Sequence, residues 1–399
     1  MKQGWEIKKL TEVVWFQEGP GVRKHQYTSS GVKLLNVANL VNGKVDLSTS
    51  DRYISSEEAY GKYKHFLVDE GDLILASSGI QVEYIEKKMG FIEKHHLPLC
   101  MNTSTIRFKS IDKNVLDITY FMYFLKSYCF KEQLFRLITG VAQLNYGPSH
   151  LKQMSIPVPP LPEQEKIVSE LDCLSGIIEK KRQQLKELDA LAQSIFYEMF
   201  GNPVDNDRGW EVVQLSSAVD EKCPISYGIV QPMDDIQDGV PIVRPVDLIE
   251  TFVYNRGLKK TSREISDSYK RTILRGDEIL MCVRGTTGIV SLATEELRGC
   301  NTTRGIVPLF FTKMNRWFMF HLFKSDAMVN LIAEHTYGIA LKQINIKDLR
   351  QLPIVIPPLP LQQSFAQKIE AIEQQKALIK QSIAEVETLF NARMQEYFE

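Results

Sequence analysis

Paired cysteine motifs, long hydrophobic runs and a strong net charge are all missing from this 399-residue sequence. Its six cysteines show no Cys-x-x-Cys spacing, which argues against a zinc site or a disulfide framework and is typical of reduced cytosolic thiols. The most apolar runs, 118–125 and 317–323, are far shorter than the ~20 residues that span a membrane. The first residues, Met1 to Glu6, lack the pattern of a signal peptide. We therefore expect a cytoplasmic protein without a membrane partner.

The sequence also lacks the motifs of enzymes that modify DNA or use nucleotides. A methyltransferase needs a glycine-rich cofactor turn and an Asn/Asp-Pro-Pro-aromatic motif, and Asn202-Pro203-Val204 lacks the second proline and the aromatic residue. A Gly-x-x-x-x-Gly-Lys-Ser/Thr phosphate loop and a Gly-x-Ser-x-Gly elbow are missing as well. No cluster of His, Asp or Glu has catalytic or metal-binding spacing. We therefore expect no catalytic residues, no metal and no cofactor bound by this chain.

A long helical pattern occurs twice. Between 163 and 200, apolar residues from Ile167 to Met199 recur in steps of three and four, and the same pattern returns between 362 and 398. Only a few charged residues interrupt it, Lys376 among them. A period of 3.5 is the signature of a coiled coil. We expect the two helices to pair antiparallel, with residues 163–200 forming a helix ~57 Å long at ~1.5 Å per residue.

The repeat extends beyond the helices. Each helix follows a Pro-Pro-Leu-Pro step, at 159–162 and at 357–360. The other matched segments are 4–10 with 209–215, 33–40 with 241–248, 71–75 with 276–280, 102–104 with 301–303 and 120–127 with 318–325. Strand-like and helical pieces alternate in each block, which predicts an α/β or α+β fold with two repeated globular domains. The expected domain ranges are 1–158, 159–203 for the first helix, 204–356, and 357–399 for the second helix.

The scaffold repeats, but its charged residues do not. Residues 206–355 contain eleven arginines and residues 1–150 contain four. Both blocks are slightly basic and the long helices are acidic, which is a weak indication of nucleic acid. Two modules with one plan and different surfaces predict two different ligands. The aromatic stretches 120–124 and 317–320 are expected in the core rather than as base-stacking surfaces.

This plan resembles the DNA-specificity (S) subunit of type I restriction–modification systems. The resemblance rests on the closing motifs 151–164 (LKQMSIPVPPLPEQ) and 349–362 (LRQLPIVIPPLPLQ), and on 283–288 (VRGTTG), 301–304 (NTTR) and 31–55. It covers essentially the whole chain and implies two target-recognition domains in a non-catalytic subunit. Two methylation subunits would dock on that subunit, and motor-nuclease subunits would join them. S-adenosylmethionine, ATP and magnesium would be bound by those partners.

The resemblance also implies how the chain would act. Each domain would read one half of an asymmetric, bipartite site in double-stranded DNA while the helices hold the domains apart as a ruler. Half-sites one helical turn apart lie ~34–36 Å from each other, within the length of such a helix. Two alternatives remain open. One is a stand-alone bipartite DNA-binding regulator, and the other is a coiled-coil adaptor without a DNA role.

Polar residues in loops are the candidates for DNA contact, with turn capping as the alternative. Arg284 is predicted to read guanine, because arginine fits the O6 and N7 atoms of guanine bidentately. Its alternative partners are a phosphate or the carboxylate of Glu295. Block one has Ser77-Ser78-Gly79 in the matching place, so that role is not carried over. The candidates in block two are Arg284, Thr286, Thr287, Asn301, Thr302, Thr303, Arg304, Lys342, Gln343 and Asn345. Those in block one are Lys24, His25, Gln26, Ser77, Ser78, Gln81, Asn102, Thr103, Gln143, Asn145 and Tyr146.

Overall fold

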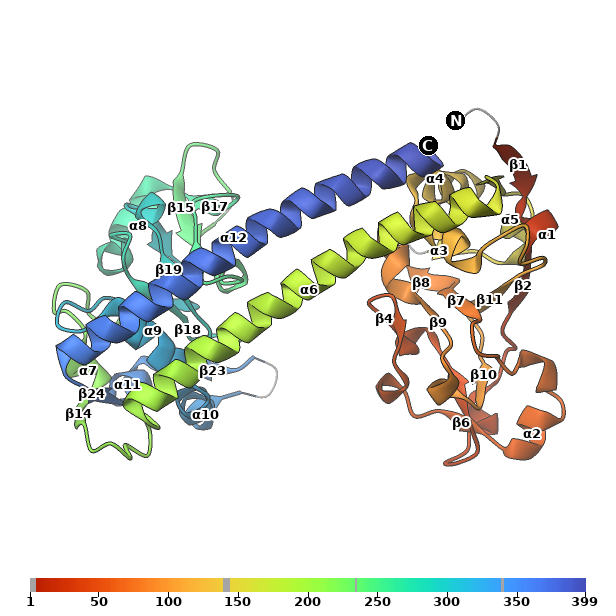
Figure 1. Ribbon diagram of the computed structural model, residues 1–399. Coiled ribbons are helices and arrows are strands. Elements are labelled where there is room, and N and C mark those ends of the chain that lie inside the picture. The colour runs from red at the N-terminus through yellow and green to blue at the C-terminus, as the bar shows by residue number, and fades with distance from the viewer. Residues whose placement is uncertain (1–4, 139–143, 234, 339–340) are drawn as a thin grey trace. The chain divides into compact units, whose positions relative to one another are not determined.

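A computed structural model describes residues 5–138, 144–233, 235–338 and 341–399 (Figure 1). The chain forms two compact units. Unit 1 consists of Met1–Lys181 and Ser382–Glu399, and unit 2 consists of Arg182–Gln381. Each unit combines a globular α+β block with the first part of one long helix and the last part of the other, which confirms the expected fold class.

Unit 1 contains two small sheets. The four-stranded antiparallel sheet has the order β2 (Val14–Glu18), β11 (Thr105–Ser110), β7 (Leu73–Ala76) and β9 (Met89–Phe91). The three-stranded sheet has the order β10 (Leu99–Met101), β3 (Val32–Leu35) and β6 (Tyr53–Ile54), with β3 and β10 parallel. Short antiparallel pairs join β1 (Glu6–Lys9) to β13 (Ser155–Val158), β4 (Leu40–Val41) to β5 (Lys44–Val45), and β8 (Ser78–Ile80) to β12 (Leu144–Asn145). The helices are α1 (Leu10–Val13), α2 (Ser56–Tyr60), α3 (Ile118–Lys126), α4 (Tyr128–Leu137) and α5 (Pro148–Leu151).

Unit 2 follows the same plan with one strand moved. Its four-stranded sheet has the order β16 (Phe252–Val253), β19 (Val290–Ala293), β18 (Ile279–Cys282) and β21 (Ile306–Leu309), so the extra edge strand pairs with β19. Its three-stranded sheet has the order β17 (Lys259–Thr261), β15 (Val240–Val243) and β20 (Asn301–Thr302), with β15 and β20 parallel. The short pairs are β14 (Glu211–Gln214) with β24 (Pro353–Ile356) and β22 (Thr336–Tyr337) with β23 (Gln343–Ile344). The helices are α7 (Leu215–Ala218), α8 (Arg263–Ser268), α9 (Arg316–Lys324), α10 (Asp326–Glu334) and α11 (Ile346–Arg350).

Matching cap residues place the aromatic helices of the two units. The Asp117 side chain accepts hydrogen bonds from the first-turn amides of α3, and the Asn315 side chain does the same for α9. Ser127 ends α3 and caps α4, and Ser325 does so between α9 and α10. Such caps satisfy amides that would otherwise lack a partner. The repeated Lys-Ser pairs of the sequence are therefore the corners between two short helices.

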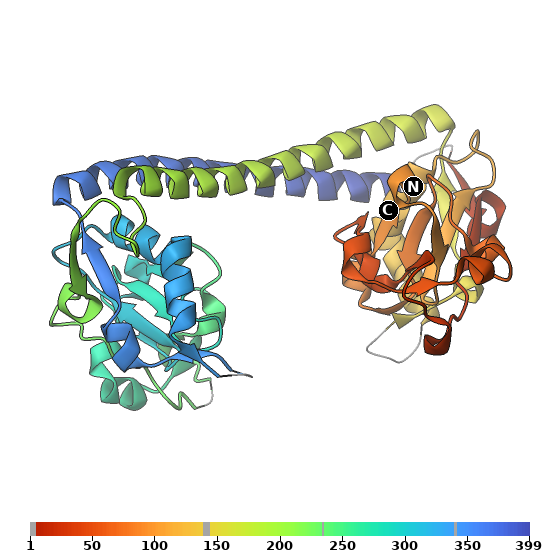
Figure 2. The ribbon, with the colours of Figure 1, turned by 90° about the horizontal axis from the view of Figure 1, so that it is seen from below.

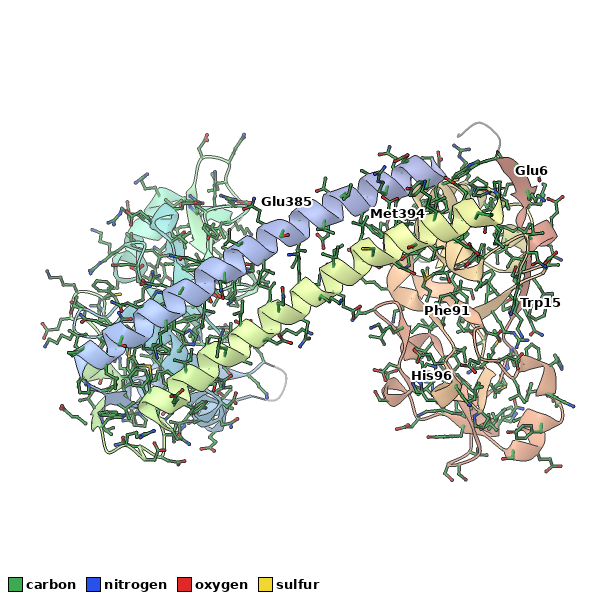
Figure 3. All side chains as sticks on the ribbon, viewed as in Figure 1. Glu6, Trp15, Phe91, His96, Glu385 and Met394 are labelled. Atoms are coloured by element: carbon green, nitrogen blue, oxygen red, sulfur yellow. The ribbon has the colours of Figure 1, made fainter. Side chains whose placement is uncertain are left out.

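The aromatic helices form a layer between the four-stranded sheet and the long helices of each unit. In unit 1, Phe121 of α3 packs on Phe108 of the sheet with ring centroids 5.2 Å apart, while Tyr120 packs at 5.2 Å on Phe398. In unit 2, Phe318 of α9 packs on Phe200 at 4.7 Å. The expectation that the aromatic stretches belong to the core is confirmed, because their aromatic side chains are fully buried except for Trp317, which is partly buried against the core of unit 2. Met394, labelled in Figure 3, joins the same core of unit 1.

The two long helices are α6 (Leu161–Phe200) and α12 (Leu359–Phe398). They begin two and three residues before the predicted starts, because proline fits the first turn of a helix, where its missing amide is not needed. In unit 2 the two helices run antiparallel (Figures 1 and 2). Phe200 contacts Phe365 and Asp189 contacts Lys376, so residue numbers decrease along α6 where they increase along α12.

One charged residue is buried on this seam. Lys376 is 6% exposed, and its ammonium donates hydrogen bonds to Asp189 at 2.8 Å and to Glu373 at 2.6 Å. Burial lowers the pKa of Lys376, but these two carboxylates outweigh it and leave the pKa raised. Removing the partners of a buried charge costs ~3–5 kcal/mol, whereas replacing the whole pair by apolar groups is often neutral.

We predict that the Lys376→Met/Glu373→Leu double variant changes the free energy of unfolding by less than ~1 kcal/mol, because apolar side chains then replace both members of the buried ion pair. The Asp189→Ala/Glu373→Ala double variant should lose ~3–5 kcal/mol, because it leaves the ammonium buried without a partner. Urea unfolding followed by tryptophan fluorescence measures both. Glu250→Ala is the control, since it breaks the exposed ion pair with Lys380. Equal losses for the Lys376→Met/Glu373→Leu and Asp189→Ala/Glu373→Ala variants would contradict the prediction.

Candidate nucleic-acid interface

The candidate residues of unit 2 lie where buried strands end. The loop after β18 carries Arg284, and the turn between β20 and β21 carries Arg304. Main-chain hydrogen bonds tie these places together: the Val283 amide donates to the Gly305 carbonyl at 2.8 Å, and the Gly285 amide donates to the Lys342 carbonyl at 2.8 Å. Three segments that are far apart in sequence therefore present their side chains at one place.

The backbone of Arg284 is held in place by its neighbours. Its backbone forms a β-bridge with Gln343, and its carbonyl accepts the Cys282 thiol at 3.3 Å. Its Nε is buried without a hydrogen-bond partner among the described residues, while the residue as a whole is half-buried. The predicted alternative partner, Glu295, instead pairs with Arg298. Pairing of Arg284 with Glu295 is therefore ruled out as an explanation.

The neighbouring candidates differ in exposure. Arg304, Lys342, Thr286 and Asn345 are exposed, and Gln343 and Thr303 are half-buried. The Thr303 hydroxyl donates to the Val243 carbonyl at 3.3 Å, and Thr287 shares a hydrogen bond of 3.2 Å with Thr336. The ion pairs of unit 2 use other cations, such as Arg244 with Asp247. Within the described part of unit 2, Arg284, Arg304 and Lys342 have no carboxylate partner.

Unit 1 repeats this main-chain arrangement with other side chains. The Ser77 amide donates to the Ser104 carbonyl at 2.8 Å, and the Tyr146 amide donates to the Ser77 carbonyl at 3.0 Å. The matching bonds of unit 2 are Val283 to Gly305 and Ile344 to Val283. By this correspondence Ser78 takes the place of Arg284, and Asn145 takes the place of Gln343. Both pairs are partners across the local strand pairing.

The strand registers correct one predicted match. The Asn102 amide donates to Leu35 of β3, and the Thr303 amide donates to Val243 of β15 in the same position. Asn102 therefore corresponds to Thr303, and not to Asn301 as the sequence match of 102–104 with 301–303 predicts. Thr103 then corresponds to Arg304.

Five candidates are buried, and the turn-capping alternative explains them. They are Ser77, Asn102, Tyr146, Asn301 and Thr302, each less than 5% exposed. The Asn102 and Asn301 side chains each accept the amide of the next residue at 2.8 Å and donate inside the protein. The Tyr146 hydroxyl donates to Ala76 at 2.6 Å, and burial raises its pKa. We withdraw these five from the DNA-contacting set, because all are buried and the side chains of Asn102, Tyr146, Asn301 and Thr302 form hydrogen bonds inside the fold.

The remaining unit 1 candidates differ in exposure and in their partners. Lys24 and His25 are exposed on a short 3₁₀ turn, while Gln26 donates to Glu58 at 2.8 Å and to Tyr63 at 3.0 Å. Ser78 is half-buried, and Gln81 and Thr103 are exposed. Gln143 lies outside the described residues.

The family model for the type I restriction modification DNA specificity domain matches residues 2–190 and 223–388, most of the chain. This chain belongs to that family. It is 25% identical over 255 residues to the specificity subunit of the Escherichia coli type I restriction enzyme EcoBI, covering 56% of this chain and 52% of that subunit. The chain thus spans about half the length of that relative. It is 24% identical over 397 residues to the putative MjaX specificity subunit of Methanocaldococcus jannaschii, covering 93% of this chain and 87% of that one.

Solved structures show the same fold. A chain from a structural study of complex assembly and conformational transition of the type I R-M system has a TM-score of 0.59 and 19% identity, covering 100% of this chain and 98% of that one. The S subunit of a type I system from M. genitalium has a TM-score of 0.52 and 14% identity, covering 99% of this chain and 96% of that one. At these identities the likeness concerns the fold alone.

Among the residues with described positions, no helix is long and apolar enough to cross a membrane. Over the same residues, no group of three or more His, Cys, Asp or Glu side chains is placed to hold a metal ion.

Sequence reasoning missed Tyr227. The Arg304 guanidinium lies over its ring, 5.6 Å from the centroid, and its hydroxyl accepts the Ile346 amide at 3.2 Å. Gly228 follows it, where an added Cβ would lie 2.2 Å from the Thr302 carbonyl oxygen. The signal in the sequence is the Tyr-Gly pair, because glycine permits this close backbone approach.

We predict that the Arg284→Ala variant relaxes preference at one base pair and loses ~1–3 kcal/mol on the preferred sequence, because arginine reads guanine bidentately. The variant, assembled with its methylation subunit, is titrated on the preferred site and on single-base variants at several salt concentrations. A uniform loss on all sequences, with a salt slope reduced by about one, would identify a phosphate contact and contradict base reading.

Proposed function

We propose that this protein is the DNA-recognition subunit of a type I restriction–modification complex and reads an asymmetric, bipartite site. One observation carries the proposal. Equivalent main-chain frames in the two units present different polar side chains, with arginine and lysine in unit 2 and uncharged residues in unit 1. Two frames with different readers suit two different half-sites, because base-edge contacts specify sequence.

The long helices would serve as ruler and docking platform in this proposal. Each is 40 residues long, or ~60 Å at ~1.5 Å per residue. That length suits half-sites separated by one turn of DNA. Two methylation subunits would dock on the chain, and motor-nuclease subunits would join through them. This subunit would be non-catalytic, and S-adenosylmethionine, ATP and magnesium would be bound by the partners.

The first test is binding with and without the methylation subunit. The isolated chain should bind DNA weakly, and addition of the methylation subunit should produce tight binding to one bipartite sequence. Gel shift on a pool of random duplexes, followed by sequencing of the bound fraction, measures this. Specific binding by the chain alone would favour a stand-alone regulator. Absence of specific binding in both cases would favour an adaptor and refute the proposal.

The second test exchanges one recognition block. Replacing residues 206–355 with the matching block of a related subunit should change one half-site and leave the other unchanged, because the frame repeats while its polar side chains differ. Methylome sequencing of cells that express the chimera with a methylation subunit measures both half-sites. Exchange of residues 1–150 is the reciprocal control. A change in both half-sites after a single exchange would contradict modular reading.

A further inference from the structure

Unit 2 gathers three cations at positions where unit 1 has none. By the main-chain correspondence, Arg284, Arg304 and Lys342 take the places of Ser78, Thr103 and Leu144. Hydrogen bonds at 2.8 Å link Val283 to Gly305 and Gly285 to Lys342, so the three residues emerge from one small area. Like charges without carboxylate partners favour an anionic ligand. The two units therefore differ in charge at these three matched positions.

The position of Arg304 is fixed twice. Its amide donates to the Ile229 carbonyl at 2.8 Å, and the Ile229 amide donates to the Thr302 carbonyl at 2.8 Å. The segment that holds Tyr227 and Ile229 is itself fastened to α11, where Arg350 donates to the Ile225 carbonyl at 2.7 Å and Ile346 donates to the Tyr227 hydroxyl. One segment, held against α11, therefore both bonds to the Arg304 backbone and carries the Tyr227 ring.

A guanidinium stacked on a ring keeps its donor edge free. Arg304 is exposed and lies 5.6 Å from the centre of the half-buried Tyr227 ring, within the range of a cation–π contact. The Arg304 side chain forms no hydrogen bond or ion pair with the described residues, so its planar fork of N–H donors is available to a ligand. Holding the fork in one orientation reduces the entropy lost on binding, and this arrangement suits a bidentate acceptor.

We infer that Arg304, oriented by Tyr227, is a second guanine-reading residue of unit 2, acting in the same half-site as Arg284. The bidentate acceptor is the O6/N7 edge of guanine in the major groove. Arg304 is the reading residue and Tyr227 is a positioning residue. The inference rests on the proposed function. It goes beyond it by assigning more than one G·C pair to the half-site read by unit 2.

The test uses the full chain assembled with its methylation subunit, titrated on its preferred duplex and on every single-base variant of the unit 2 half-site at several salt concentrations. Arg304→Ala should reduce discrimination at one G·C pair by about 5- to 150-fold, and that pair should differ from the one affected by Arg284→Ala. Arg304→Lys keeps the charge but lacks the fork, so it should lose the same discrimination while retaining the salt slope. Lys313→Ala removes an exposed charge beyond the other end of β21 and should preserve the preference.

Two variants test the positioning role. Tyr227→Phe keeps the ring and should stay within about twofold of the parent in discrimination at that pair. Tyr227→Leu removes the ring and should lose discrimination at the pair that Arg304→Ala affects. Full discrimination in Tyr227→Leu would overturn the positioning role.

The remaining outcomes separate the inference from the proposed function. Specific binding by the parent complex, combined with a uniform loss for Arg304→Ala and none for Arg304→Lys, would identify a phosphate contact and overturn the inference alone. Arg304→Ala behaving like Lys313→Ala would also overturn it. Absence of any sequence preference in the parent complex would instead refute the proposed function.

Discussion

One buried glutamine fixes where each long helix leaves its block. The Gln164 amide group donates to the Pro159 and Val115 carbonyls, each at 2.8 Å, and its oxygen accepts the Asp117 amide at 2.9 Å. Gln362 repeats this in unit 2 with Pro357 at 2.7 Å and the Asn315 amide at 2.8 Å. Asp117 and Asn315 are the caps of the aromatic helices. The start of the long helix and the start of the aromatic helix are therefore joined by hydrogen bonds that no apolar residue can replace, since an unpaired buried group costs ~1–3 kcal/mol.

This clamp explains why the closing motif is informative in the sequence. The prolines come first and the glutamine follows one helical turn later. This short motif therefore marks the junction between the globular block and the long helix. The heptad pattern is informative for the same reason, because a helix that packs over many turns must repeat its apolar side. The pattern was less accurate at its end. A strict seam includes Ile195 and Met199, whereas Phe196 and Phe200 are the buried residues, because α9 adds a second packing face there.

The candidate site was harder to predict, because asparagine and threonine suit turns as well as DNA. The Asn-Thr pairs of the two blocks look equivalent in sequence, yet the strand registers set them two residues apart. Asn102 therefore matches Thr303, and Thr103 matches Arg304. Arg304 is exposed in that turn, whereas Asn301 is held inside by five side-chain hydrogen bonds. The sequence alone does not show which of these residues is exposed and which is buried.

The arrangement of the reading positions explains how one fold can hold different readers. Main-chain bonds carry the frame in both units, from Ser77 to Ser104 and from Val283 to Gly305. The side chains that differ take little part in it, because Arg284, Arg304 and Lys342 form no ion pair within the described part of unit 2. Gathering cations costs free energy, but exposure to water keeps that cost small. A frame held by backbone bonds and an aromatic core therefore tolerates arginine in one copy and serine or threonine in the other. Under the proposed function the ligand would select the charge at these positions, while the stability of the frame depends on the backbone bonds and the aromatic core.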